Sequence, residues 1–104
     1  MGQEQDAAAR DKQARAYFRA GAFKLAGDEF VASYELDPKA TRLYNAALAY
    51  EKAGEKALAV EHYGKYLALV SEGDKAVESR ARKAALELSI RQDKAEEERR
   101  RKLD

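Results

Sequence analysis

The sequence predicts an all-α fold built from antiparallel helix pairs, on three observations. Alanine, the strongest helix former, supplies 22 of the 104 residues. Glycine and the single proline are spaced so that they divide the chain into helix-length segments. The first two pairs of segments also repeat each other. Because large apolar residues are few, the composition favours thin helical layers with alanine at the contacts over a thick core, and the length fits one small domain.

Glycine and proline mark the ends of the predicted helices. Gly21 and Gly54 lack a Cβ and suit the left-handed conformation that closes a helix. Pro38 ends another helix because proline disfavours a helical residue before it. Asp74 is the expected N-cap of the last helix, after a turn. Together these signals predict five helices, at about 4–20, 23–36, 40–53, 56–70 and from 74 to beyond 100.

Residues of the first helix pair recur in the second pair at a constant offset in residue number, the one that separates Tyr17 from Tyr50. An aromatic residue, a glycine, an alanine and a second aromatic residue occur at this offset in the same order in both pairs: Tyr17, Gly21, Ala26 and Phe30, then Tyr50, Gly54, Ala59 and Tyr63. A small residue at a helix crossing lets the two axes come close, and the aromatic rings fill the space on either side. The sequence therefore predicts two similar units stacked on each other.

This pattern resembles the tetratricopeptide repeat, a helix–turn–helix unit of about 34 residues. Phe23 and Pro38 also match the family in the first copy, whereas no proline follows the second copy. The resemblance implies a right-handed α-solenoid in a single domain, with repeats at about 7–39 and 40–73 and a capping helix at about 74–104. It also implies a non-catalytic protein-interaction module or adaptor, because the first helices of such repeats line a concave, peptide-binding face.

Projection of the helices onto that concave face gives the candidate groove residues. They are Lys12, Arg15, Arg19, Tyr44, Asn45, Leu48, Lys52, Lys75 and Arg82. Most of them are basic, which favours an acidic peptide or a chain-terminal carboxylate as ligand. The alternative is that these are ordinary solvated charges of exposed helix faces. Asp11, in the same region, would repel a carboxylate.

The fifth helix carries a second candidate surface. An apolar stripe at helical spacing, Val77, Ala81, Ala84 and Leu88, is expected to pack on the fourth helix. Leu86 and Ile90 fall beside this stripe, so they form an alternative partner surface. Under that alternative, the chain is a structural element of a larger repeat array or a homo-oligomer that assembles through its capping helix.

The end of the fifth helix is expected to be solvated. The segment 91–104 consists mostly of charged residues, with basic and acidic side chains in near balance. This balance and the net charge of +1 argue against a nucleic-acid partner, which would require a basic excess.

The sequence does not predict catalysis, a metal site or a cofactor. His62 is the single histidine, there is no cysteine, and the glycines form no phosphate-binding loop. His62 is expected to be an exposed or interface residue. No apolar run is long enough to span a membrane and no signal peptide is present, so a full-length chain would be cytoplasmic by default.

Overall fold

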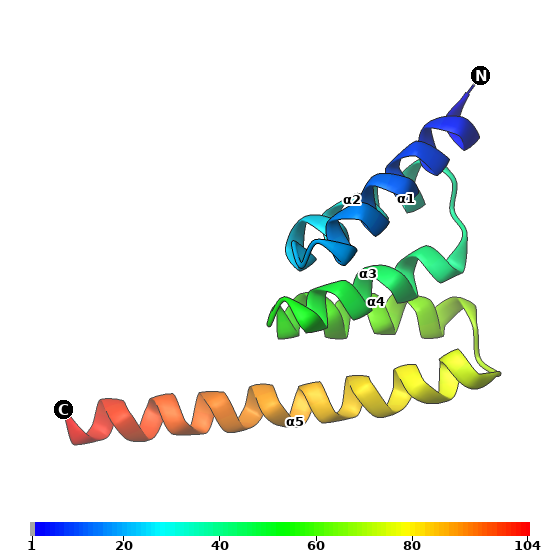
Figure 1. Cartoon of the computed structure of the whole chain (residues 1–104). Helices are drawn as coiled ribbons and strands as arrows, with labels where there is room; N and C mark the ends of the chain where they lie inside the picture. Colours follow the sequence, from blue (N-terminus) through cyan, green and yellow to red (C-terminus); the bar gives the residue numbers. More distant parts are fainter. Residues whose placement is uncertain (1) are drawn as a thin grey trace.

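The computed structural model describes residues 2–104 and confirms the all-α class, with no strand among these residues. Each of the first four helices begins and ends within one residue of its predicted bounds. In Figure 1, α1 and α2 form one antiparallel pair, α3 and α4 form the next, and the long α5 lies at the edge of the stack. The five helices are α1 (Gln3–Arg19), α2 (Phe23–Leu36), α3 (Ala40–Lys52), α4 (Lys56–Leu69) and α5 (Asp74–Leu103).

The internal repeat extends to the backbone hydrogen bonds that close α1 and α3. Gly21 and Gly54 have φ angles of +82° and +79°, the left-handed conformation expected of glycine after a helix. The Gly21 N–H donates to Phe18 O at 3.1 Å and the Ala22 N–H to Tyr17 O at 2.9 Å. The equivalent bonds after α3 measure 3.0 and 2.9 Å. Both turns are Schellman motifs, and they direct α2 and α4 back along the helix before them.

The core consists of alanines at the helix contacts and aromatic rings between them. Ala26 and Ala59, the predicted crossing residues, are fully buried. Phe30 is 3% exposed, and Tyr63 is fully buried. The ring of Tyr44 lies 6.1 Å from that of Tyr63, in an edge-to-face arrangement that stabilises aromatic pairs.

Gly27 marks a close approach between α2 and a side chain of α3. A Cβ on this residue would lie 2.6 Å from Cε1 of Tyr50, so the ring of α3 occupies the space that a side chain on α2 would need. Gly64 lies in α4 but has no such neighbour, because its Cβ would meet only the flexible Lys83 side chain, at 3.5 Å. A close approach therefore explains Gly27 and not Gly64.

The predicted packing face of α5 is wrong. All four residues of the expected stripe are exposed, with Val77 at 61% and Leu88 at 48%. The helix instead turns Ala76, Ser79 and Leu86 toward the body. Ala76 and Leu86 belong to the same buried cluster as Tyr63 and Tyr66 of α4.

Two further expectations about α5 need correction. Leu86 is 9% exposed and belongs to the core, and Ile90 is half-buried, so these two residues do not form an exposed partner surface. The N-cap of α5 is Gly73, with φ +103°, and Asp74 is the first helical residue. Beyond residue 91 every side chain is exposed, and the end of α5 projects past the other helices (Figure 1).

Candidate functional site

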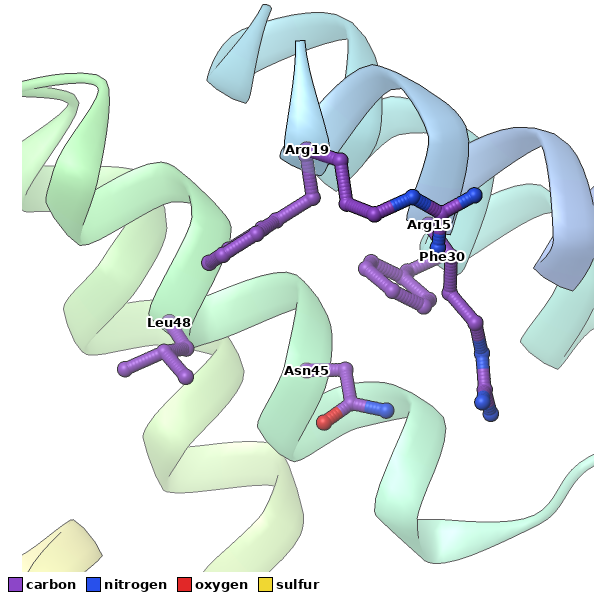
Figure 2. Close-up of a pocket in the computed structure, with 6 residues that line it drawn as sticks. Arg15, Arg19, Phe30, Asn45 and Leu48 are labelled. Carbon is purple, nitrogen blue, oxygen red and sulfur yellow. The ribbon is translucent and has the colours of Figure 1, made fainter. Parts of the chain in front are cut away.

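A pocket opens between the two helix pairs, where α1, α2 and α3 meet. Its volume is about 330 Å³, and six residues line it: Arg15, Phe18, Arg19, Phe30, Asn45 and Leu48. Four of these, Arg15, Arg19, Asn45 and Leu48, are candidate groove residues from the sequence. Figure 2 shows the two arginines on α1 facing Asn45 and Leu48 on α3 across the opening.

Aromatic rings give the pocket an apolar surface. Phe30 reaches it from α2, and its ring is almost completely buried (Figure 2). Phe18 is half-buried and contacts Phe23 edge to face, with 5.1 Å between the ring centroids. The sequence assigned Phe30 to packing within its repeat and indicated no role for Phe18. Both rings line the boundary between the two helix pairs, and this boundary is a property of the stacking.

The two arginines of the pocket differ in their surroundings. Arg15 forms an ion pair with Asp11 one turn earlier, at 2.8 Å, while its side chain stays 61% exposed. Arg19 has no ion-pair partner among residues 2–104. The side-chain amide of Asn45 is half-buried, and no other group in that part of the chain hydrogen-bonds to it. Arg19 and Asn45 therefore keep free donors at the pocket.

Asp11 lies beside the pocket in an ion-pair network. Besides Arg15, it contacts Arg42, whose Nε is 3.7 Å from Asp11 Oδ1. Arg42 is 7% exposed and also donates to the backbone oxygen of Asp37, at 2.7 Å. Because two guanidinium groups offset the charge of Asp11, its repulsion of a bound carboxylate is weaker than the sequence suggested. Arg42 was not recognised from the sequence, where it stood as one basic residue among many.

Two other residues predicted for the groove, Tyr44 and Arg82, lie in an internal hydrogen-bond network between α3, α4 and α5. Tyr44 is 7% exposed, and its hydroxyl donates to Glu78. Arg82 contacts Glu78 at 3.1 Å and Glu51 at 3.3 Å. The Tyr63 hydroxyl donates to Glu51 at 2.8 Å. Tyr44 and Arg82 therefore connect α5 to the second pair; Tyr44 is buried, whereas the Arg82 side chain is 37% exposed but already paired with two glutamates.

The pKa values of these groups reflect the same environment. Burial, reinforced by the hydrogen bond to Glu78, raises the pKa of Tyr44 to about 12. Burial and the bond to Glu51 raise the pKa of Tyr63 as well. The hydrogen bond from Tyr44, followed by that from Arg82, lowers the pKa of the Glu78 carboxyl. Tyr44 and Tyr63 therefore remain neutral donors, and Glu78 remains a charged acceptor, over the physiological pH range.

Three lysines predicted for the groove lie outside the pocket. The Nζ of Lys52 stands 5.9 Å from the ring centroid of Phe23, and that of Lys75 stands 5.7 Å from the centroid of Tyr44. Both contacts are in the range of cation–π interactions. Lys12 is exposed on α1 and is not among the pocket residues. The structure thus gathers four of the nine predicted residues at one place.

Residues that often carry chemistry are not clustered elsewhere in residues 2–104. His62 is 4% exposed, which corrects the expectation of an exposed or interface histidine. Its Nδ1 lies 2.8 Å from the backbone oxygen of Leu58, and its ring packs 5.2 Å from that of Tyr50. No group of three acidic or histidine side chains in this part of the chain is arranged to hold a metal ion. No helix within it has the length and apolarity needed to cross a membrane.

Comparison with known proteins does not assign the chain to a family. No protein-family model matches the sequence, and no curated protein is significantly similar to it. Function is therefore inferred from the repeat and from the pocket between the helix pairs.

Proposed function

We propose that this chain is a non-catalytic protein-interaction module of the tetratricopeptide type, which binds an acidic peptide segment in the pocket between α1, α2 and α3. In this proposal the two helix pairs are successive repeats of a right-handed α-solenoid, and α5 is the capping helix. The repeat of both sequence and turn geometry at the same constant offset supports this assignment.

The single observation that carries the binding proposal is the combination of an apolar surface with free donors in one pocket. Phe18 and Leu48 provide the accessible surface for an apolar side chain, and the buried ring of Phe30 lies beside them. Arg19 has no partner in the described chain and can bind a carboxylate in a bidentate manner. The Asn45 amide can hydrogen-bond to the backbone of an extended peptide. The ligand that fits is a peptide with an apolar side chain next to one or two carboxylates.

The ion pairs determine which basic side chain of the site is available to a ligand. Arg15 already shares its charge with Asp11, and Arg82 shares its charge with two glutamates. Of the two arginines that line the pocket, Arg19 is therefore the one whose charge is available to a ligand. A free C-terminal carboxylate beside an apolar last residue would place its charge at Arg19 and its side chain on the rings.

A titration with defined peptides tests the proposal. Short fluorescein-labelled peptides that end in Glu-Asp-Leu or Glu-Asp-Phe would be compared with the same peptides amidated at the C-terminus, by fluorescence anisotropy. Arg19→Glu is expected to weaken binding by about tenfold or more, equivalent to about 1.4 kcal/mol. The matched control is Arg99→Glu, the same charge change at an exposed residue of the α5 tail. Equal affinity of Arg19→Glu and wild type, or no binding up to about 1 mM peptide, would refute the proposal.

The alternative function is a structural one, in which the chain assembles with other repeats or with itself through α5. The observation that favours it is the exposed apolar residues Val77 and Leu88 on the outward side of that helix. The surface differs from the one predicted from the sequence, because Leu86 is buried.

A further inference from the structure

The outward side of α5 carries an ordered stripe of exposed residues. Their spacing of three and four residues keeps them on one side of the helix over about five turns. From one end to the other, the stripe reads acidic, apolar, small, small, apolar, basic: Asp74, Val77, Ala81, Ala84, Leu88 and Arg91. No residue of the candidate pocket belongs to it.

The repeat indicates that a helix belongs on this side of α5. At the offset that relates the two helix pairs, Val77 and Ala84 correspond to Tyr44 and Glu51. Those two residues of α3 face α4, because Tyr44 packs against the ring of Tyr63 and Glu51 accepts a hydrogen bond from its hydroxyl. In the second helix pair, the positions equivalent to Val77 and Ala84 are thus covered by a helix, whereas Leu48, the equivalent of Ala81, lines the pocket. On α5 the corresponding positions are exposed, and Figure 1 shows α5 at the edge of the stack with its outer side open.

The order of residues in the stripe is complementary to itself in the antiparallel direction. Two copies of α5 can pair about a twofold axis that passes between residues 82 and 83. Each residue then faces the residue of the second copy for which the two residue numbers sum to 165. Val77 then meets Leu88 of the second copy, and Ala81 meets its Ala84. Asp74 meets Arg91, so an acidic and a basic group face each other at both ends. Neither Asp74 nor Arg91 has an ion-pair partner among residues 2–104.

We propose that the outer stripe of α5 is a self-association surface, through which two copies of this chain form an antiparallel pair of α5 helices. The alanines at the centre allow a close approach, near the lower end of the usual 8–10 Å between helix axes. The paired segment, from Asp74 to Arg91, is about 26 Å long. Such a contact falls below the area of a standard interface, so the dimer is weak and concentration-dependent.

Sedimentation velocity of the full chain provides the first test, at concentrations from about 10 μM to about 1 mM. Asp74→Arg and Arg91→Asp each place like charges at both ends of the pair, and each is expected to weaken self-association by about tenfold. An equimolar mixture of the two variants should associate at least as well as wild type, because opposite charges then face each other again. A wild-type chain that stays monomeric throughout, or single variants that associate like wild type, would overturn the proposal.

Cysteine cross-linking tests the direction of the pair, and the chain offers a clean background because it has no cysteine. Val77→Cys and Leu88→Cys change exposed residues, so both variants are expected to fold, which circular dichroism would verify. Under mild oxidation, a mixture of the two variants should form a covalent dimer, whereas neither variant should do so alone. Cross-linking of each variant with itself would indicate a parallel pair and refute the proposed register.

Discussion

Gly27 provides a sensitive test of how the two helix pairs contact each other, through the substitution Gly27→Ala. The added Cβ would lie 2.6, 2.7 and 2.9 Å from three ring carbons of Tyr50. Carbon atoms in ordinary contact are about 3.5–4.0 Å apart, so the ring would have to move by roughly 1 Å. Tyr50 is 3% exposed and its hydroxyl donates to Asp28 at 2.6 Å, which restrains that movement.

Two opposing effects determine how much Gly27→Ala changes the free energy of unfolding. Overpacking of a core by a methyl group costs about 1–3 kcal/mol. Replacement of glycine by alanine inside a helix contributes up to about 1 kcal/mol in the other direction. We expect Gly27→Ala to lower the free energy of unfolding by about 1–2 kcal/mol. For a domain of this size, the melting temperature should fall by about 5–15 °C.

Gly64→Ala is the matched control, because it makes the same change in the interior of α4. Its Cβ would meet only Lys83 Cε at 3.5 Å, an ordinary contact with a flexible side chain. The helix-propensity gain should therefore remain, and this variant should be stabilised by up to about 1 kcal/mol. The same substitution is thus expected to have opposite signs at the two positions.

Thermal and urea unfolding, followed by circular dichroism, would measure both variants. Tyr50→Phe in the Gly27→Ala background provides a second measurement, since it removes the bond to Asp28 and frees the ring to move. The double variant should lose less stability than the sum of the single changes. If Gly27→Ala is as stable as Gly64→Ala, the close approach of α2 to Tyr50 is incorrect, and so is the stacking deduced from it.

Three further predictions concern pH and the truncation of α5. Because the folded-state pKa of Tyr44, about 12, exceeds the usual value near 10, its contribution to stability should be complete below about pH 10 and lost between about pH 10 and 12. Chemical unfolding at several alkaline pH values should show this loss, and Tyr44→Phe should reduce it. Truncation after Arg91 should leave a folded chain by circular dichroism and melting, because the side chains removed are exposed. Truncation after Ser71 should cause aggregation, since Tyr66 on α4 would lose its cover; a folded monomer would contradict this.

The helices could be predicted from the sequence because their ends depend on local chemistry. Gly21 and Gly54 adopt left-handed conformations that other residues rarely occupy, and Pro38 follows the end of α2. These signals require no knowledge of distant contacts. The alanine and aromatic positions of the repeat were equally informative, because Ala26 and Ala59 are both fully buried.

The orientation of α5 was not predicted, and the reason is physical. Counting large apolar residues selects the side with Val77 and Leu88, both of which are exposed. The side that packs on α4 presents two small residues, Ala76 and Ser79, and one large one, Leu86, and Tyr63 and Tyr66 of α4 belong to the same buried cluster. Helix periodicity shows that a helix has distinct faces, but the shape of its neighbour determines which face is buried.

The charge that the groove offers to a ligand could not be predicted from its composition either. The sequence predicted a mostly basic concave face, but two of its six basic residues, Arg15 and Arg82, are paired with acidic neighbours. Asp11 pairs with Arg15 on α1, and Glu51 on α3 pairs with Arg82 on α5, far away in the sequence. Such pairing cannot be read from the net charge of +1.

This redistribution of charge bears on how a ligand would be held. If Arg19 provides most of the available charge, a bound peptide neutralises about one charge, and its affinity should fall only gently as salt rises. The larger share of the binding free energy must then come from the apolar contact with Phe18 and Leu48, since Phe30 is 3% exposed, at about 25 cal/mol per Å² of surface buried. The pocket should therefore discriminate peptides by the side chain placed on the rings first, and by the number of carboxylates second. A basic groove holding an acidic chain by charge alone would show the opposite order.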